Sequence, residues 1–308
     1  MSDPLHILGA GSLGLLLAAR CTLAGVPCQL ILRTREAVCA WRQRDNLLLL
    51  EQQGQSTPLK VAGELADESA QPIRLLVVAT KAWAVADALD SVVHRLTPDS
   101  QILLLQNGLG SQQAVSRRLP DHRVLYASVT DGAWLRSPNQ VVWAGSGQTL
   151  IGDPAAGPAP DWLQRLTRAG IDWRWESDIL PVLWLKLAVN CAINPLSALH
   201  DCPNGEVPER AGAIFEPLLA ELHALLSSEG VSLSLAELRE RILAVIRATA
   251  SNSSSMRQDV LAGRRTEIDF ILGHAWRSAR QAGLSTPVLD ALYLQLQNHL
   301  TERGLPRN

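Results

Sequence analysis

The stretch Leu5–Gly14, LHILGAGSLG, constrains the fold more than any other part of this 308-residue chain. A short apolar run, Leu5–Leu8, leads into a glycine turn with the spacing G-x-G-x-x-G, and an apolar, helix-like segment, Leu15–Leu23, follows. This order predicts a strand, a tight turn and a helix. The turn consists of Gly9, Ala10, Gly11, Ser12, Leu13 and Gly14.

The three glycines each have a physical task in a dinucleotide site. Gly9 permits the tight turn, Gly11 lets the backbone approach a pyrophosphate, and Gly14 lets the helix pack closely on the strand. Free N–H groups and the positive end of the helix dipole would then face the anion. An ordinary turn has the same composition, but the position directly after a buried-looking strand favours dinucleotide binding by residues 9–14.

The end of the next predicted strand, Cys28–Leu32, indicates which dinucleotide is bound. NAD-binding units usually carry an acid there for the ribose 2′-hydroxyl, whereas this chain has Arg33, with Arg35 nearby. A guanidinium can bind a 2′-phosphate through two parallel charge-assisted hydrogen bonds. The sequence therefore predicts NADP as the cofactor; the alternative for Arg33 is a solvated surface arginine.

Two further apolar runs, Leu75–Ala79 and Ile102–Leu105, are typical of buried parallel strands. Lys81 and Asn107 follow them closely, and the carboxyl ends of parallel strands border the crevice where ligands bind. We expect Lys81 to contact a cofactor phosphate or the substrate, and Asn107 to contact the nicotinamide ribose or the substrate. A surface lysine and a plain Asn-Gly turn are the alternatives.

The pattern changes at about Ile179, where strand-like runs give way to long helical periodicities. Before it, Val141–Trp143 and Thr149–Gly152 read as two antiparallel strands that close the sheet. We predict an α/β and all-α protein: an N-terminal Rossmann-type doubly wound sheet over residues 1–177 and a C-terminal all-helical domain over residues 178–308. We expect the active site between them.

Composition excludes several classes of partner. The net charge of −2 gives no electrostatic reason to bind nucleic acid or an anionic membrane. The five cysteines form no C-x-x-C pair, which favours reduced thiols without a metal site, and the start lacks a basic signal region. We therefore expect a cytoplasmic protein. The apolar stretch Ile179–Leu199 approaches membrane-spanning length, but its lysine, two asparagines and proline indicate a buried core helix.

Three polar side chains on that helix, Lys186, Asn190 and Asn194, are spaced i, i+4 and i+8. They fall within roughly 80° of one helix face. Burying them among apolar neighbours is costly without a partner, and a polar ligand would offset that cost. A structural polar network explains the spacing equally well. Pro195 cannot donate to the carbonyl of Cys191, so we expect the helix to kink or end near Asn194.

A second polar cluster comprises the runs Ser253–Asp259 and Gly263–Asp269. A serine run before a helical stretch is often an N-cap. Acidic residues such as Asp259 and Glu267 are more often solvated than catalytic. Spacing alone selects neither of them for chemistry.

Taken together, these motifs resemble those of ketopantoate reductase (2-dehydropantoate 2-reductase) over essentially the whole chain. The blocks around Lys186 and Glu267 are much more specific than the glycine turn. The resemblance rests on LGAGSLG, Lys81-Ala82-Trp83, Gln106-Asn107-Gly108, the run from Lys186 to Leu196, Cys202-Pro203-Asn204-Gly205-Glu206, and the run from Ser254 to Asp269.

The resemblance implies NADPH-dependent reduction of 2-dehydropantoate to (R)-pantoate, a step toward pantothenate and coenzyme A. It implies that Lys186 is the general acid and that Glu267 lies close to it and supports substrate and cofactor placement. The implied substrate-binding residues are Asn107, Lys186, Asn190, Asn194, Asn204 and Ser255. The implied cofactor-binding residues are those of the glycine turn with Arg33, Lys81, Asn107 and Glu267.

Several points stay open at this level. Some relatives carry glutamine where this chain has Ala84, which removes at most one cofactor contact. Burial would lower the pKa of Lys186 and Glu267 would raise it, and the sequence does not decide the balance. The alternatives are a reductase of another 2-keto acid or an imine, and a non-catalytic NADP(H)-binding regulator. Apolar helical stripes fit a homodimer face or the domain's own core.

Overall fold

The structure, a computed structural model, describes residues 3–308. The chain divides into two compact units, one with the residues up to Gln106 and Ser111–Ile179, the other with Asn107–Gly110 and Leu180–Asn308. The first unit is an α/β domain and the second is helical, so the predicted fold class is confirmed. The assignment of Asn107–Gly110 to the helical unit was not anticipated by the ranges 1–177 and 178–308.

The main sheet of the first unit has, within the described residues, the order β12-β11-β8-β7-β6-β1-β2-β5. Its strands are β1 (Leu5–Leu8), β2 (Cys28–Leu32), β5 (Gly63–Leu65), β6 (Ile73–Val78), β7 (Leu96–Leu104), β8 (Arg123–Val129), β11 (Thr149–Gly152) and β12 (Trp173–Glu176). All neighbours are parallel except β8 and β11. Leu8 aligns with Ile31 and with Val78, so the carboxyl ends of these strands lie at one edge of the sheet.

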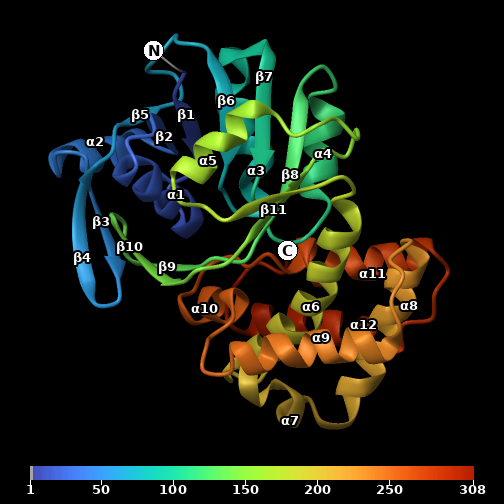
Figure 1. Ribbon diagram of the computed structural model, residues 1–308. Helices are drawn as coiled ribbons and strands as arrows, with labels where there is room; N and C mark the ends of the chain where they lie inside the picture. The colour runs from blue at the N-terminus through green and yellow to red at the C-terminus, as the bar shows by residue number, and fades with distance from the viewer. Residues whose placement is uncertain (1–2) are drawn as a thin grey trace. The chain divides into compact units, whose positions relative to one another are not determined.

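The helices of this unit connect the parallel strands, as Figure 1 shows. They are α1 (Ser12–Leu23), α2 (Arg35–Gln43), α3 (Val85–Val92), α4 (Ser111–Arg118) and α5 (Gln164–Arg168), with 3₁₀ turns η1 (Ala82–Ala84), η2 (Val93–Arg95) and η3 (Asp161–Leu163). Helices α2 and α4 were not predicted. Their sequences are mostly polar, and α2 buries only Val38 and Trp41, so the apolar periodicity that marks a helix is weak there.

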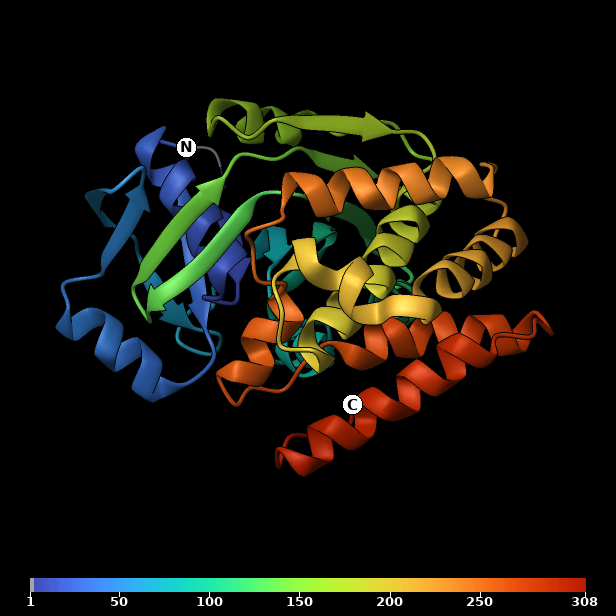
Figure 2. The ribbon, with the colours of Figure 1, turned by 90° about the horizontal axis from the view of Figure 1, so that it is seen from below.

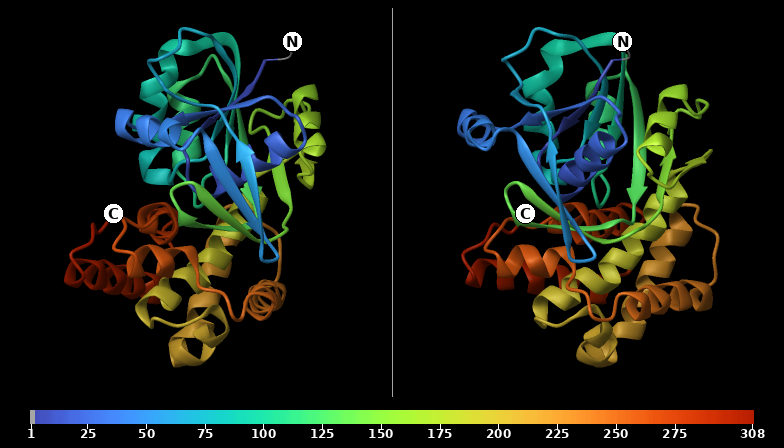
Figure 3. Two further views of the ribbon diagram at one scale, coloured as in Figure 1. Left: turned by 90° about the vertical axis from the view of Figure 1, so that its left-hand side faces the viewer. Right: turned by 60° about the vertical axis from the view of Figure 1, so that its left-hand side comes forward.

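A second, four-stranded sheet has the order β4-β3-β10-β9. It comprises β3 (Leu47–Gln52), β4 (Gln55–Lys60), β9 (Gly132–Ser137) and β10 (Gln140–Gly145), and Figure 3 shows the β3–β4 hairpin in blue beside the green β9–β10 hairpin. Of the two antiparallel strands expected to close the main sheet, the one at 149–152 joins it antiparallel to β8, whereas the one at 141–143 lies in the second sheet. β10 pairs with β9 and β3, whereas β11 pairs with β8. A tight turn at Pro138 and Asn139 joins β9 to β10, and the Asn139 side chain donates to Leu47 O.

Helix α1 packs on both sheets, because it contacts β1 and β2 as well as β3, β9 and β10. Arg20 near its end is buried, and its guanidinium donates to Asp131 at 3.3 Å and to Gly170 O. The same guanidinium lies 4.4 Å from the ring centre of Trp143. The buried charge is therefore paired and fixes α1 against the elements that follow β8.

The glycine turn between β1 and α1 is forced by close backbone packing. Gly9 has φ +108°, a conformation that side chains rarely adopt. A Cβ on Gly14 would stand 2.0 Å from Gly9 O and 3.2 Å from Ala79 Cβ. The tight turn and the close helix–strand approach predicted for Gly9 and Gly14 are therefore present in the structure.

The helical unit is arranged around α6 (Leu180–Leu199), which contacts α8 to α12. Figure 2 shows α9 on one side of α6 and α11 and α12 on the other. The other elements are η4 (Asn204–Glu206), α7 (Val207–Ala211), η5 (Gly212–Ile214), α8 (Phe215–Ser228), α9 (Leu235–Ala248), α10 (Ser255–Leu261), η6 (Ile268–Phe270), α11 (Leu272–Gln281) and α12 (Pro287–Glu302).

Helix α6 is long and apolar enough to cross a membrane by length and composition, but it is mostly buried inside the protein, as the core-helix interpretation predicted. Of the two alternatives given for Pro195, an end near Asn194 is wrong, because the helix continues to Leu199. Proline removes one backbone hydrogen bond from the helix. Packing against the surrounding helices holds the last turn in spite of that loss.

Gly14→Ala tests the turn. The added methyl group collides with Gly9 O, and we expect a loss of about 1–3 kcal/mol in the free energy of unfolding. Chemical denaturation measures it. Gly145→Ala is the matched control, since no atom lies within 4 Å of its Cβ position. Equal stability of the two variants would contradict this account of the turn.

Candidate active site

The carboxyl edge of the main sheet gathers the predicted cofactor residues of the first unit. The glycine turn follows β1, Arg33 follows β2, and Lys81 lies just beyond the end of β6. Gly11 is the N-cap of α1, and no side chain of the described residues makes a capping hydrogen bond at this helix end. The first N–H groups of α1 are thus available to an anion at the positive end of the helix.

Arg33 is exposed and precedes Thr34, the N-cap of α2. Thr34 accepts a hydrogen bond from the Ala37 N–H at 3.2 Å, so a side chain already caps this helix. Lys81 is half-buried at the start of η1. Three features at this sheet edge fit the phosphate groups of a dinucleotide. They are the Arg33 guanidinium near the start of α2, the uncapped N-terminus of α1, and the Lys81 ammonium.

In the helical unit, Lys186, Asn190 and Asn194 lie along one face of α6, as their spacing predicted. Lys186 and Asn190 are half-buried, and Asn194 is 8% exposed. Burial lowers the pKa of the Lys186 ammonium to about 8, while the carboxylate of Glu267 opposes the shift. The sequence did not decide which effect on the Lys186 pKa is larger, and in the structure burial has a larger effect than Glu267.

Glu267 precedes η6 and is 5% exposed. Acids in such polar stretches are more often solvated, but both of these are buried, and Asp259 is only 3% exposed. Both residues lie where the chain folds back between α10 and α11. Asp259 accepts a hydrogen bond from Arg264 Nε at 3.0 Å, whereas Glu267 interacts with the Lys186 charge. Glu267 therefore belongs to the lysine site.

The segment Asn107–Gly110 is fastened to the same 3₁₀ turn. The Leu109 N–H donates to Phe270 O at 2.8 Å, and the Phe270 N–H donates to Glu267 O at 3.1 Å. A Cβ on Gly108 would stand 2.1 Å from Phe270 O, and Gly108 has φ +79°. One short turn thus connects the backbone of Glu267 to the segment that carries Asn107.

The imidazole of His274 on α11 also lies near this segment. Its Nδ1 lies 3.0 Å from the Cβ position of Gly110, and its ring centre lies 5.4 Å from that of Trp184 on α6. Burial, with a smaller effect of Arg277, lowers the pKa of His274 to about 4. The imidazole is therefore neutral near pH 7, and Lys186 is the better proton donor there.

Asn204 and Ser255, both expected to bind the substrate, differ in burial and in contacts. Asn204 is buried on η4 and its Nδ2 donates to Thr249 Oγ1 at 3.0 Å, while its Oδ1 has no hydrogen-bond partner among residues 3–308. Ser255 is exposed as the first residue of α10. Its neighbour Ser254 is the N-cap, as expected for the serine run, and accepts from the Arg257 N–H. Asn204 is thus tied to the end of α9.

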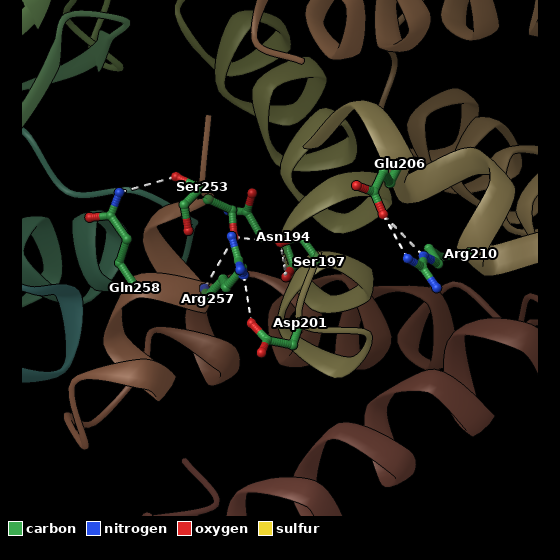
Figure 4. Close-up of polar contacts among 9 residues, drawn as sticks. Asn194, Ser197, Asp201, Glu206, Arg210, Ser253, Arg257 and Gln258 are labelled. Atoms are coloured by element: carbon green, nitrogen blue, oxygen red, sulfur yellow. Dashed lines mark hydrogen bonds and ion pairs between the residues drawn. The ribbon is translucent and has the colours of Figure 1, made fainter. Parts of the chain in front are cut away.

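The side chains that join α6 to α10 were not expected from the sequence to form a group. Ser197 contacts Ser254, and Asp201 pairs with Arg257; Figure 4 shows this group. Ser197 continues the spacing of the Lys186 face, and that continued period was the available signal for it, whereas Asp201 lies beyond the end of α6.

Gly108→Ala should separate the Asn107 segment from η6. The methyl group cannot fit beside Phe270 O, so we expect the Leu109 amide to lose its bond and to exchange hydrogen at least about 10-fold faster. Mass spectrometry after deuterium labelling measures this. Gly230→Ala has a similar φ of +77° with open space around it, and serves as the control. Unchanged protection at Leu109 would contradict the proposed connection.

Comparison with known proteins identifies the family. A model described as ketopantoate reductase PanE/ApbA matches residues 5–156, and the model of its C-terminal part matches residues 178–299. The 2-dehydropantoate 2-reductase of Vibrio cholerae serotype O1 is 36% identical over 94% of this chain and 96% of its own length.

Solved structures agree on the fold. A PanE/ApbA family ketopantoate reductase from Ralstonia eutropha JMP134 has a TM-score of 0.86 at 25% identity, covering 98% of this chain and 100% of its own. D-mandelate dehydrogenase, solved with NADH and anilino(oxo)acetate, has a TM-score of 0.88 at 22% identity with the same coverage. A dimeric ketopantoate reductase from Staphylococcus aureus, 21% identical with the same coverage, has a TM-score of 0.81. The family models and the near-full-length relative together show that this chain belongs to the ketopantoate reductase family.

Proposed function

We propose that this chain reduces 2-dehydropantoate to (R)-pantoate with NADPH, as a cytoplasmic step toward pantothenate and coenzyme A. The observation that carries the proposal is the Lys186–Glu267 pair: a lysine with a pKa of about 8, held on an apolar helix beside a buried carboxylate. Relatives along nearly the whole chain are 2-dehydropantoate 2-reductases, which supports the choice of substrate.

Bound NADPH would supply a hydride to the keto carbon of the substrate. The carbonyl oxygen then becomes a strong base, and the Lys186 ammonium donates a proton to it. A pKa of about 8 suits this role, because the group is mostly protonated at pH 7 and still gives up its proton readily. Glu267 keeps Lys186 charged against the effect of burial.

The amide and hydroxyl groups around Lys186 would orient the substrate. Asn190 and Asn194 follow Lys186 along α6 at one-turn intervals, where their amides can bind the carboxylate and hydroxyl groups of 2-dehydropantoate. Ser255 would add a hydroxyl contact. The buried Oδ1 of Asn204 accepts no hydrogen bond, so a substrate hydroxyl would satisfy it. Asn107 would lie between the substrate and the nicotinamide ribose.

Arg33 and Lys81 would hold the 2′-phosphate of NADP, while the glycine turn would hold the pyrophosphate. Arg33 supports NADP over NAD, because it stands at the end of β2 where an acid would repel a phosphate. D-mandelate dehydrogenase has the same fold and was solved with NADH, so the cofactor preference rests on these side chains. A homodimer is also part of the proposal, by analogy with the dimeric Staphylococcus aureus enzyme.

A second candidate is a reductase of another 2-keto acid. It is favoured by one observation: the D-mandelate dehydrogenase structure, which has the same fold, contains anilino(oxo)acetate in place of ketopantoate. A non-catalytic NADP(H)-binding regulator is less favoured, because binding alone would not require an ammonium with a pKa of about 8 beside a buried acid.

The first test is NADPH oxidation by the purified protein, followed by absorbance with 2-dehydropantoate and a panel of other 2-keto acids. We expect turnover with 2-dehydropantoate and a preference for NADPH over NADH. Arg33→Gln should reduce that preference by about 10- to 100-fold, the range expected for losing charge-assisted hydrogen bonds.

Arg44→Gln, which removes an exposed arginine just after α2, should leave the preference unchanged. A faster reaction with another keto acid would move the proposal to that substrate. An unchanged cofactor preference in Arg33→Gln would remove Arg33 from the 2′-phosphate site.

The pH dependence of kcat/KM tests whether Lys186 donates the proton. Reduction needs the protonated Lys186, so kcat/KM should be constant at low pH and should fall as pH rises through about 8. Because Glu267 raises the pKa of Lys186, Glu267→Gln should move this alkaline limb to lower pH. Glu302→Gln on α12 is the control. A limb that stays in place in Glu267→Gln would show that another group donates the proton.

A further inference from the structure

The polar face of α6 continues beyond Asn194. Ser197 follows three residues later on the same face of the helix, and Asp201 lies two residues beyond the helix end at Leu199. Figure 4 shows Asn194, Ser197 and Asp201 next to one another, with Ser253 and Arg257 of the adjacent segment beside them. The mechanism proposed above uses neither Ser197 nor Asp201.

Ser197 is fully buried, and its hydroxyl contacts both sides of the α6–α10 crossing. Its Oγ donates to Asn194 O at 3.1 Å and lies 2.5 Å from Ser254 Oγ. Ser254 in turn caps α10, because its Oγ accepts from the Arg257 N–H at 3.1 Å. The Ser197 hydroxyl therefore connects the backbone of Asn194 to the first turn of α10.

Asp201 makes the second connection. It lies just after α6 with φ +47°, a left-handed conformation that aspartate adopts more readily than most residues. Its Oδ1 accepts from Arg257 Nε at 2.8 Å, and the Arg257 side chain is only 21% exposed. The Gln258 amide braces the same turn by donating to Ser253 O at 3.1 Å.

Ser255 lies between the two anchored residues, one position after Ser254 and two before Arg257. Helix α10 has seven residues, and a helix of that length depends on tertiary contacts for its stability and placement. The two contacts with Ser197 and Asp201 fix the first turn of α10 at one place along α6. They thereby determine where Ser255 stands relative to Asn194.

We propose that Ser197 and Asp201 are positioning residues for substrate binding: they hold the first turn of α10 against α6, so that Ser255 meets the same substrate as Asn190 and Asn194. The inference rests on the proposed function. Neither residue touches the substrate or the cofactor in this scheme. Their effect should therefore appear in substrate affinity and much less in the chemical step.

The kinetic test uses Ser197→Ala and Asp201→Asn. Loss of one hydrogen bond should raise KM for the keto acid by about 5- to 10-fold in Ser197→Ala, with kcat and NADPH affinity changed by less than about 2-fold. Asp201→Asn keeps the left-handed residue and an acceptor oxygen, so its effect should be smaller than that of Asp201→Ala. Ser197→Ala and Ser254→Ala should be non-additive in KM, since they remove the same contact.

Two controls match these changes. Ser278→Ala removes a buried serine from α11, and Glu216→Gln weakens the ion pair with Arg239 that joins α8 and α9. Both should leave KM unchanged. Hydrogen exchange provides a readout independent of turnover: the amides of residues 255–261 should exchange faster in Ser197→Ala and remain protected in Ser278→Ala.

The outcomes separate the inference from the proposed function. Unchanged KM in Ser197→Ala and Asp201→Ala, with an active wild-type protein, overturns the inference and leaves the function standing. A fall in kcat with unchanged KM also overturns it. A wild-type protein that reduces another keto acid instead of 2-dehydropantoate overturns the proposed substrate, and the same KM comparison with that acid then decides the inference.

Discussion

The constraint that the helical unit must meet is the burial of two opposite charges, those of Lys186 and Glu267. An ammonium in the middle of a core helix is unfavourable unless something compensates for the water it has lost. Here a buried carboxylate supplies part of that compensation, and the remaining cost appears as a pKa lowered to about 8. A pair arranged for stability alone would keep the lysine fully charged. This one leaves it close to giving up its proton at neutral pH.

Two short elements near these charges depend on other parts of the helical unit for their position. The 3₁₀ turn η6 carries Glu267 at its start, and its Phe270 carbonyl fixes the segment with Asn107. Helix α10 is tied to α6 through Ser197. Neither element is long enough to hold its own geometry. Their placement therefore follows from contacts with longer helices, α6 for α10 and α11 for η6, which is how a rigid scaffold can present polar groups precisely.

The features that the sequence predicted well are those that local period and backbone sterics determine. Gly9 is required by its own φ of +108°, and Gly14 by the Gly9 carbonyl five residues earlier. The face shared by Lys186, Asn190 and Asn194 follows from helix geometry alone. The second sheet was missed because β10 pairs with β3, almost a hundred residues earlier in the chain. Such pairings leave no trace in a local pattern. The polar helices α2 and α4 were not predicted for a related reason: tertiary contacts determine them more than a periodic pattern of apolar residues does.

The same distinction between local patterns and long-range contacts applies to the two buried acids. Asp259 and Glu267 look alike in sequence, both in polar stretches near the end of the chain, and both are buried. Asp259 accepts a hydrogen bond from a nearby arginine, Arg264, five residues away. Glu267 meets Lys186, eighty-one residues before it, and only the fold creates that meeting. The fold decides which distant charge a buried acid faces, and the resemblance to a known family supplied what periodicity could not.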